Sequence, residues 1–251
     1  MDSVSPLSSN FDDLTPAVEF HLLGRVDFDD GLMLQRRLAK EASQRGDGRI
    51  DVLLCEHDGP ITVGRQGSRL HVRLSGEELD QRGLSLEWVS RSGGCVLHAP
   101  GQLAIYPIVP LAFHGWSREQ YADRLHAAFS AVLATLSVQA VRKSNRAGLW
   151  GRTGQLVALG IAVRRGVAMH GAFVNVCPER REFGYVDTAA ADGDERGRAA
   201  VMSSLLAEAR RPVKMTSVRA ALVEQLPQAF GLERYHLHTG HPYLCPLSRL
   251  A

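Results

Sequence analysis

Residues 91–102 read RSGGCVLHAPGQ, and the apolar segment LAIYPIV at 103–109 follows directly. The two adjacent glycines let backbone N–H groups approach a ligand closely, because neither residue carries a Cβ. Arg91 adds a fixed charge and His98 adds a hydrogen-bonding imidazole. A Pro-Gly turn then leads into a strand, as is usual where a binding loop is held by rigid elements. The stretch predicts a pocket floor; a hairpin whose glycines serve only the turn remains the alternative.

Strands and helices are predicted on both sides of this stretch. Apolar runs and turn residues predict strands over 18–24, 51–56, 60–65, 86–89, 103–109, 148–150, 155–163 and 172–176. Helical spacing and capping residues predict helices over 28–45, 75–82, 117–136 and 218–230. Mixed short strands and a few helices indicate an α+β fold, with a central mixed or antiparallel sheet flanked by helices and the glycine stretch on one of its faces.

Length and composition are those of one globular domain. The chain has 251 residues, of which 45% are hydrophobic and 22% charged, enough for a substantial core without staples. We expect a flexible tail at 1–16, the domain at 17–235 and a C-terminal tail at 236–251. The segment 188–200 is rich in Ala, Asp, Gly and Arg, and both a lid and a plain surface loop remain open for it.

Charge and cysteine usage exclude several function classes. A net charge of +2 with interspersed acids argues against a nucleic-acid partner. The four cysteines lie far apart without a Cys-x-x-Cys pair, which disfavours a metal site and a disulfide framework. The first 15 residues lack a signal-peptide pattern and no apolar run is long enough to cross a membrane. We therefore expect a cytoplasmic protein without metal, cofactor, membrane or nucleic acid.

Further motifs add polar groups to the same predicted pocket. Residues 156–161 read LVALGI, a strand with a glycine near its end, and residues 169–176 read MHGAFVNV, a second His-Gly pair at the head of a strand. Each motif alone is a weak signal, because a single histidine is more often a core or surface residue than a ligand.

The order of these pieces resembles the lipoate-protein ligase B type of octanoyltransferase, within the lipoate and biotin protein ligases. Residues 56–65 resemble that family's E-H-x-x-x-x-x-x-G-R segment, and residues 91–102 its R-G-G-x-x-x-x-H-G-P-G-Q signature. Residues 148–150 stand where the family has G-V-W, residues 158–160 match A-L-G, and residues 170–176 match H-G-x-x-x-N-V. The resemblance covers roughly residues 18 to 231.

The resemblance implies transfer of an octanoyl group from acyl carrier protein to a lysine of a lipoyl domain, through a thioester on a cysteine. The implied partners are octanoyl-acyl carrier protein and the lipoyl domains of 2-oxoacid dehydrogenases or the glycine cleavage H protein, and a monomer is expected. The implied substrate-binding residues are Arg91, Ser92, Gly93, Gly94, His98, Gly101, Gln102, Ala158, Leu159, Gly160, His170, Gly171, Ala172, Phe173 and Asn175.

Two positions depart from the family pattern at the centre of this chemistry. Gln155 occupies the place of the family lysine, and a glutamine amide neither carries a positive charge nor accepts a proton near neutral pH. The family cysteine is missing, because no cysteine lies between Phe183 and Ser203. Cys177 is the candidate for a relocated nucleophile, with Cys95 as a second thiol, and His98 and His170 are candidate bases for direct transfer.

Three functions remain open at this point. The first is an octanoyltransferase-like acyltransferase. The second is a catalytically inactive relative that binds an acyl group or a carrier protein. The third is an enzyme like the ATP-dependent lipoate ligases, because the glycine stretch also resembles the ligase loop.

Overall fold

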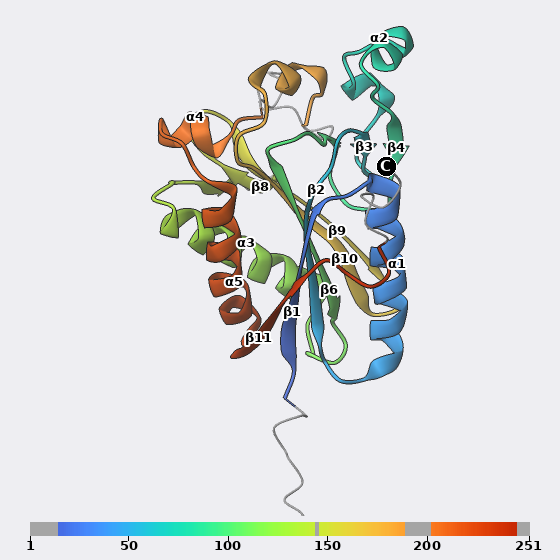
Figure 1. Cartoon of the computed structure of the whole chain (residues 1–251), viewed down its shortest axis with the longest axis vertical. Coiled ribbons are helices and arrows are strands. Elements are labelled where there is room, and N and C mark those ends of the chain that lie inside the picture. Colours follow the sequence, from blue (N-terminus) through green and yellow to red (C-terminus); the bar gives the residue numbers. More distant parts are fainter. Residues whose placement is uncertain (1–14, 144–145, 189–201, 245–251) are drawn as a thin grey trace, which may run out of the picture.

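The computed structural model describes residues 15–143, 146–188 and 202–244. Its centre is an eight-stranded sheet with the order β11-β1-β2-β6-β10-β9-β8-β7 (Figure 1). These strands are β1 (Ala17–Arg25), β2 (Ile50–Glu56), β6 (Gln102–Pro110), β7 (Val141–Lys143), β8 (Arg146–Trp150), β9 (Gln155–Arg164), β10 (Val167–Asn175) and β11 (Arg234–Thr239). Strand β1 is parallel to β2 and β11, and the other neighbours pair antiparallel. The predicted mixed sheet is confirmed.

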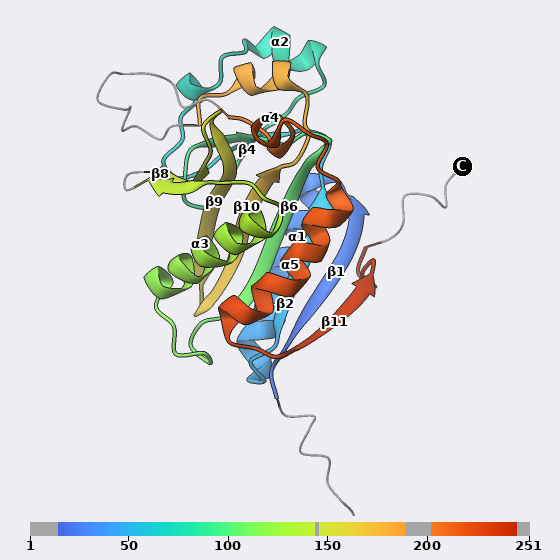
Figure 2. The same ribbon diagram turned by 90° about the vertical axis from the view of Figure 1, so that its left-hand side faces the viewer.

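Helices cover both faces of this sheet. Helix α1 (Phe28–Arg45) lies on one face, and α3 (Arg118–Thr135) and α5 (Met215–Phe230) lie on the other (Figures 1 and 2). Helix α1 has the predicted bounds, because Asp27 caps its first turn and Gly46 takes the left-handed conformation that ends it. Helix α5 begins three residues before the predicted start at 218.

Strand β6 forms the middle of the core. All nine of its residues are buried, because β2 and β10 flank it and helices cover both of its faces. The apolar segment at 103–109 predicted this strand. The residues that surround it divide into a cluster on the α3 and α5 face and a second cluster on the α1 face, as the alternation of side chains along a strand requires.

A smaller, three-stranded sheet lies at one end of the molecule and carries the glycine stretch. Its order is β4 (Leu86–Trp88), β3 (Ile61–Val63) and β5 (Cys95–Leu97). Helix α2 (Gly76–Gln81) belongs to this part, and its predicted capping box is present between Ser75 and Glu78. Two short 3-10 helices, η2 (Arg69–His71) and η3 (Arg180–Tyr185), complete it.

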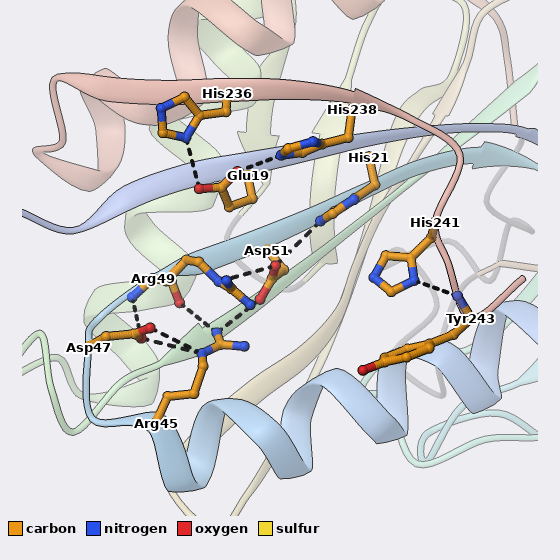
Figure 3. A network of polar contacts seen from close by, with 10 residues as sticks. All are labelled: Glu19, His21, Arg45, Asp47, Arg49, Asp51, His236, His238, His241 and Tyr243. Atoms are coloured by element: carbon orange, nitrogen blue, oxygen red, sulfur yellow. Dashed lines mark hydrogen bonds and ion pairs between the residues drawn. The ribbon is translucent and has the colours of Figure 1, made fainter. Parts of the chain in front are cut away.

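The C-terminal segment differs from the prediction of a tail that starts at residue 236. Residues 234–239 form β11, which pairs with β1 from Ala17 to Leu22. Glu19 accepts hydrogen bonds from His236 Nδ1 at 2.9 Å and His238 Nε2 at 2.6 Å (Figure 3). The strand is mostly exposed, so it lacks the apolar alternation by which a sequence reveals a strand.

Several predicted segments lie outside the described residues. They are residues 1–14 of the predicted N-terminal tail, nearly all of the 188–200 segment, and residues 245–251, which include Cys245. Helix α4 (Leu205–Ala209) follows the second of these gaps. Within the described ranges, no helix is both long and apolar enough to span a lipid bilayer.

Candidate functional site

The glycine loop, residues 90–94 between β4 and β5, curls around the side chain of Arg91. The guanidinium Nη2 donates to the carbonyl of Thr62 at 3.0 Å and to its hydroxyl at 2.8 Å. Nη1 donates to the carbonyls of Gly94 at 3.0 Å and Ser92 at 3.2 Å. Arg91 is only 2% exposed, and burial lowers its pKa to about 10, which leaves it charged at neutral pH. The charge therefore holds the loop together.

The loop binds the open edge of β9, whereas the sequence predicted it on a face of the sheet. Strand β8 pairs with β9 no further along than Val157. Beyond that point, Ser92 N–H donates to the carbonyl of Ile161 at 2.9 Å, and Ile161 N–H donates to Ser92 Oγ at 3.1 Å. A Cβ at Gly160 would lie 2.5 Å from the Ser92 carbonyl oxygen. The close approach of loop and strand therefore requires this glycine.

The backbone of Gly93 is bound by Gln66. Gly93 has a φ of 90°, and its N–H donates to Gln66 Oε1, while Gln66 N–H donates to the Gly93 carbonyl at 3.1 Å. The Gln66 side chain is exposed and belongs to the turn after β3. A carbonyl oxygen thus occupies the very N–H group that the sequence predicted for ligand binding.

A cavity of about 330 Å³ opens beside the loop, on the α3 side of the sheet. This volume is near the lower end of the roughly 300–1,000 Å³ typical of small-molecule sites. Apolar walls from β9 and α3 face a polar rim. Its lining is Ser92, Leu159, Gly160, Ile161, Arg118, Glu119, Ala122, Leu125 and His126. Two larger hollows, between α5 and β11 and between α3 and β8, contain none of the predicted site residues.

His98 lies behind the loop, on the α1 side of the sheet. Its ring is 1% exposed and contacts Phe173 and His57, with centroids 4.6 and 5.7 Å away. Its Nε2 lies 3.0 Å from the Thr62 hydroxyl, the same group that Arg91 binds. Burial, then the charges of His57 and Arg91, lower the pKa of His98 well below 6.5. His98 is therefore neutral and supports the partner of Arg91. Ala158 packs on this same face.

His170 and Gly171 sit at an interruption of the β10–β6 ladder. The pairs on either side are Ala168 with Val109 and Ala172 with Ile105, so the register places His170 opposite a proline, which lacks an N–H. His170 has a φ of 59°, and its N–H donates to Gln35 Oε1 of α1 at 3.1 Å. Burial, then Arg91, lower the pKa of His170 to about 3.

Gly171 lies where β10 and β6 approach each other closely, and Ala172 packs in the core next to it. A Cβ at Gly171 would lie 2.3 Å from the carbonyl oxygen of Ile105. Ala172 is fully buried in the core on the α3 face. These two residues therefore shape the sheet behind the cavity rather than line it.

A chain of buried amides joins the strand ends at the loop side of the sheet. Gln102 Nε2 donates to the Leu97 carbonyl at 3.0 Å and to Asn175 Oδ1 at 2.9 Å. Asn175 Nδ2 donates to the carbonyl of Gln155 at 3.4 Å. Gln155 itself is 5% exposed. The structure therefore brings three predicted residues from three strands together.

Cys177 is exposed and follows β10 at this same end. Its N–H donates to the Gly101 carbonyl at 3.0 Å, and a Cβ at Gly101 would lie 2.8 Å from the Cys177 carbonyl oxygen. Cys95, in contrast, is buried, and burial raises the pKa of its thiol. Of these two candidate thiols, only Cys177 is exposed to solvent.

Several residues of the site were not found from the sequence. Thr62, Gln66 and Glu208 bind Arg91, Gly93 and the turn before Gln155, respectively. Thr62 and Gln66 flank the Gly-Arg pair at 64–65, which was a usable signal, but Glu208 lies 53 residues beyond Gln155 in a polar segment without a motif. Among the described residues, no three His, Cys, Asp or Glu side chains are placed to hold a metal ion.

Comparison with known proteins gives one consistent result. Residues 27–227 match the family model described as the lipoyl protein ligase A/B catalytic domain. The chain is 34% identical over 174 residues to an octanoyltransferase of Syntrophobacter fumaroxidans, covering 69% of this chain and 75% of that protein. It is 33% identical over 198 residues to an octanoyltransferase of Geotalea uraniireducens, covering 79% and 86%.

A solved structure shares the fold. The bi-partite lipoate protein ligase of Thermoplasma acidophilum superposes with a TM-score of 0.68 at 15% identity, covering 91% of this chain and 89% of that one. At this identity the likeness concerns the arrangement of the strands and helices alone.

Proposed function

Because this chain belongs to the lipoyl protein ligase A/B catalytic-domain family, we propose that it is an octanoyltransferase-like protein of lipoate biosynthesis. Its substrates are then octanoyl-acyl carrier protein and a lysine of a lipoyl domain, from a 2-oxoacid dehydrogenase or the glycine cleavage H protein. The chain acts as a cytoplasmic monomer without a cofactor in this proposal.

The cavity beside the glycine loop carries the proposal. Leu125, Leu159 and Ile161 give it apolar walls that suit an octanoyl chain, and Ser92 marks the end where the loop begins. A thioester carbonyl at that end would lie next to Ser92, the residue that joins the cavity to the glycine loop. Gln66 Oε1 already occupies the Gly93 N–H as such an oxygen would, and its exposed side chain is free to yield the place.

Two chemical routes are compatible with these residues. In the first, the Cys177 thiolate attacks the octanoyl thioester and releases the carrier thiol, and the lysine amine then attacks the new thioester, forming the amide and freeing Cys177. In the second, the lysine amine attacks the carrier thioester directly. The amide group of Gln155 has N–H donors that either route could use, but it takes no proton. His98, buried and neutral, contributes through Thr62 and Arg91.

Two observations favour a binding protein without transfer activity as the second candidate. Gln155 stands where the family has a lysine, and Cys95 is too buried to act as a nucleophile. Such a relative would keep the cavity and bind an acyl chain or a carrier protein. An ATP-dependent lipoate ligase is the third candidate function.

Intact-mass spectrometry separates these functions. The protein is incubated with octanoyl-acyl carrier protein, and apo lipoyl domain is then added; a parallel reaction contains lipoate and ATP. An octanoyl adduct that hydroxylamine removes and that Cys177→Ser abolishes supports the thioester route, with Cys95→Ser as the matched control. Octanoylated lipoyl domain without an enzyme adduct supports direct transfer. Binding without product leaves the inactive relative, and lipoylation that needs ATP identifies the ligase.

A further inference from the structure

The turn at 151–154, between β8 and β9, is built around the carboxylate of Glu208 from α4. Glu208 Oε1 accepts from the N–H and the Nε of Arg152, both at 3.1 Å. Oε2 accepts from the N–H of Thr153 at 2.9 Å and from its hydroxyl at 2.6 Å. Glu208 is 6% exposed, and a Cβ at Gly151 would lie 2.7 Å from this carboxylate. The turn therefore has room for the carboxylate only because residue 151 is glycine.

Glu208 is charged and does not act as a base. Burial raises its pKa, but the hydrogen bonds from Thr153 and Arg152 outweigh burial and lower the pKa to about 2. The Thr153 hydroxyl, which donates to Glu208, also lies 2.7 Å from the hydroxyl of Ser203. A carboxylate with so low a pKa is too weak a base to activate either hydroxyl as a nucleophile.

The segment 202–208 is bound to two strands beside the candidate site. Ser203 N–H donates to the carbonyl of Gln155 at 2.9 Å, and Leu206 N–H donates to the carbonyl of Val176, next to Cys177, at 3.1 Å. Figure 2 shows α4 across the ends of β9 and β10. One short segment therefore contacts the chain at both Gln155 and the residue before Cys177.

We propose that Glu208 is a positioning residue, which clamps the 151–154 turn and so fixes Gln155 beside the end of the strand that carries Cys177. The inference rests on the proposed function, because Gln155 holds the place of the family lysine. Without the carboxylate, the four donors of the turn lose their acceptor, and the turn loses these four ties to α4. A displacement of about 1 Å at a reacting group costs up to about 100-fold in rate.

The first test compares Glu208→Gln with the control Glu224→Gln, which removes an exposed charge on α5. In steady-state octanoyl transfer, we expect Glu208→Gln to lower kcat about 10-fold or more while KM stays within about 2-fold. Glu224→Gln is expected to change neither. A Glu208→Gln variant with wild-type kcat overturns the inference.

A second pair of variants covers the case in which Glu208→Gln does not fold. Thr153→Ser keeps the hydroxyl that donates to Glu208, whereas Thr153→Val removes it. The serine variant is expected to retain kcat and the valine variant to lose it. Equal kcat in the two variants contradicts the clamp, because the hydroxyl would then be dispensable. A higher kcat in the valine variant also contradicts it, because the methyl group would then act through packing.

Amide hydrogen exchange distinguishes failure of the inference from failure of the proposed function. In Glu208→Gln we expect faster exchange at Arg152, Thr153 and Ser203, with β2 and β6 unchanged. If wild-type protein transfers no octanoyl group, the proposed function fails, and exchange decides alone: local acceleration supports the positioning role and unchanged exchange refutes it.

Discussion

At the residue scale, Arg91 is a buried cation that binds four oxygen atoms of uncharged groups. The order Arg-Ser-Gly-Gly at 91–94 places Arg91 in the glycine loop, and the sequence pattern predicted that its charge faces a ligand. The sequence could not show that the guanidinium points inward, since this depends on where the turn directs the carbonyls of Ser92 and Gly94. The guanidinium of Arg91 therefore supports the structure of the loop through its four hydrogen bonds.

Replacing this guanidinium tests its structural role. Arg91→Lys leaves a single ammonium, which cannot reach all four acceptors, so buried carbonyls lose their partners. We expect the free energy of unfolding to fall by about 2 kcal/mol or more, as unpaired buried groups cost about 1–3 kcal/mol each. Urea denaturation measures it, with Arg164→Lys on the exposed end of β9 as the control. Equal losses in both variants would show that the four bonds contribute little.

At the element scale, most helices and strands were predictable because local signals agreed with the fold. Helix α1 has an N-cap, helical spacing of apolar residues and a terminal glycine, and its bounds match the prediction. Strand β11 was missed for the opposite reason. Its partner β1 lies more than 200 residues earlier, and its polar side chains find Glu19 only after the chain has folded. Such a strand depends on tertiary contacts rather than on its own pattern.

The contact between the loop and β9 was also invisible in the sequence, and Gly160 tests it. A Cβ there would meet the Ser92 carbonyl oxygen at 2.5 Å, so Gly160→Ala is expected to push the loop off the strand edge. Amide exchange at Ser92 and Ile161 should accelerate, and octanoate binding, measured calorimetrically, should weaken about 10-fold or more, in keeping with a displaced binding loop. Gly76→Ala, where a Cβ meets nothing within 4 Å, is the control. Unchanged exchange at Ser92 would refute the contact.

At the scale of the whole molecule, the candidate site is divided by the central sheet. The motif residues fall into the cavity group on the α3 side, the His98 group on the α1 side and the amide chain at the strand ends. The sequence predicted a single pocket for these residues and gave no sign of this division. Side chains alternate between the two faces along a strand, so neighbouring motif residues such as Ala158 and Leu159 lie on opposite faces of the sheet.

Buried neutral histidines give the whole fold an acid limit. Because the folded pKa of His170, about 3, lies below its ordinary value, the unfolded chain binds the proton first. Stability is therefore lost as the pH falls from about 6.5 towards 3, by up to about 1.4 kcal/mol per pH unit for each such histidine. His170→Asn removes the titrating ring and suits a φ of 59°. Urea denaturation at several pH values between 7 and 4 gives the free energy of unfolding, which should fall less steeply with decreasing pH in this variant than in the wild type. An identical pH dependence would contradict the burial of a neutral ring.

The parallel pairing of β1 with β11 has a mechanical consequence. The first and last described strands lie side by side and point the same way, with six residue pairs from Ala17–Arg234 to Leu22–Thr239. A force that pulls Ala17 and Thr239 apart therefore acts along the two strands and loads all of the hydrogen bonds between them together. In an antiparallel pair at this place, the hydrogen bonds between the strands would break one after another. The β1–β11 pair thus resists such a force by shear, although the side chains of β11 are mostly exposed to water.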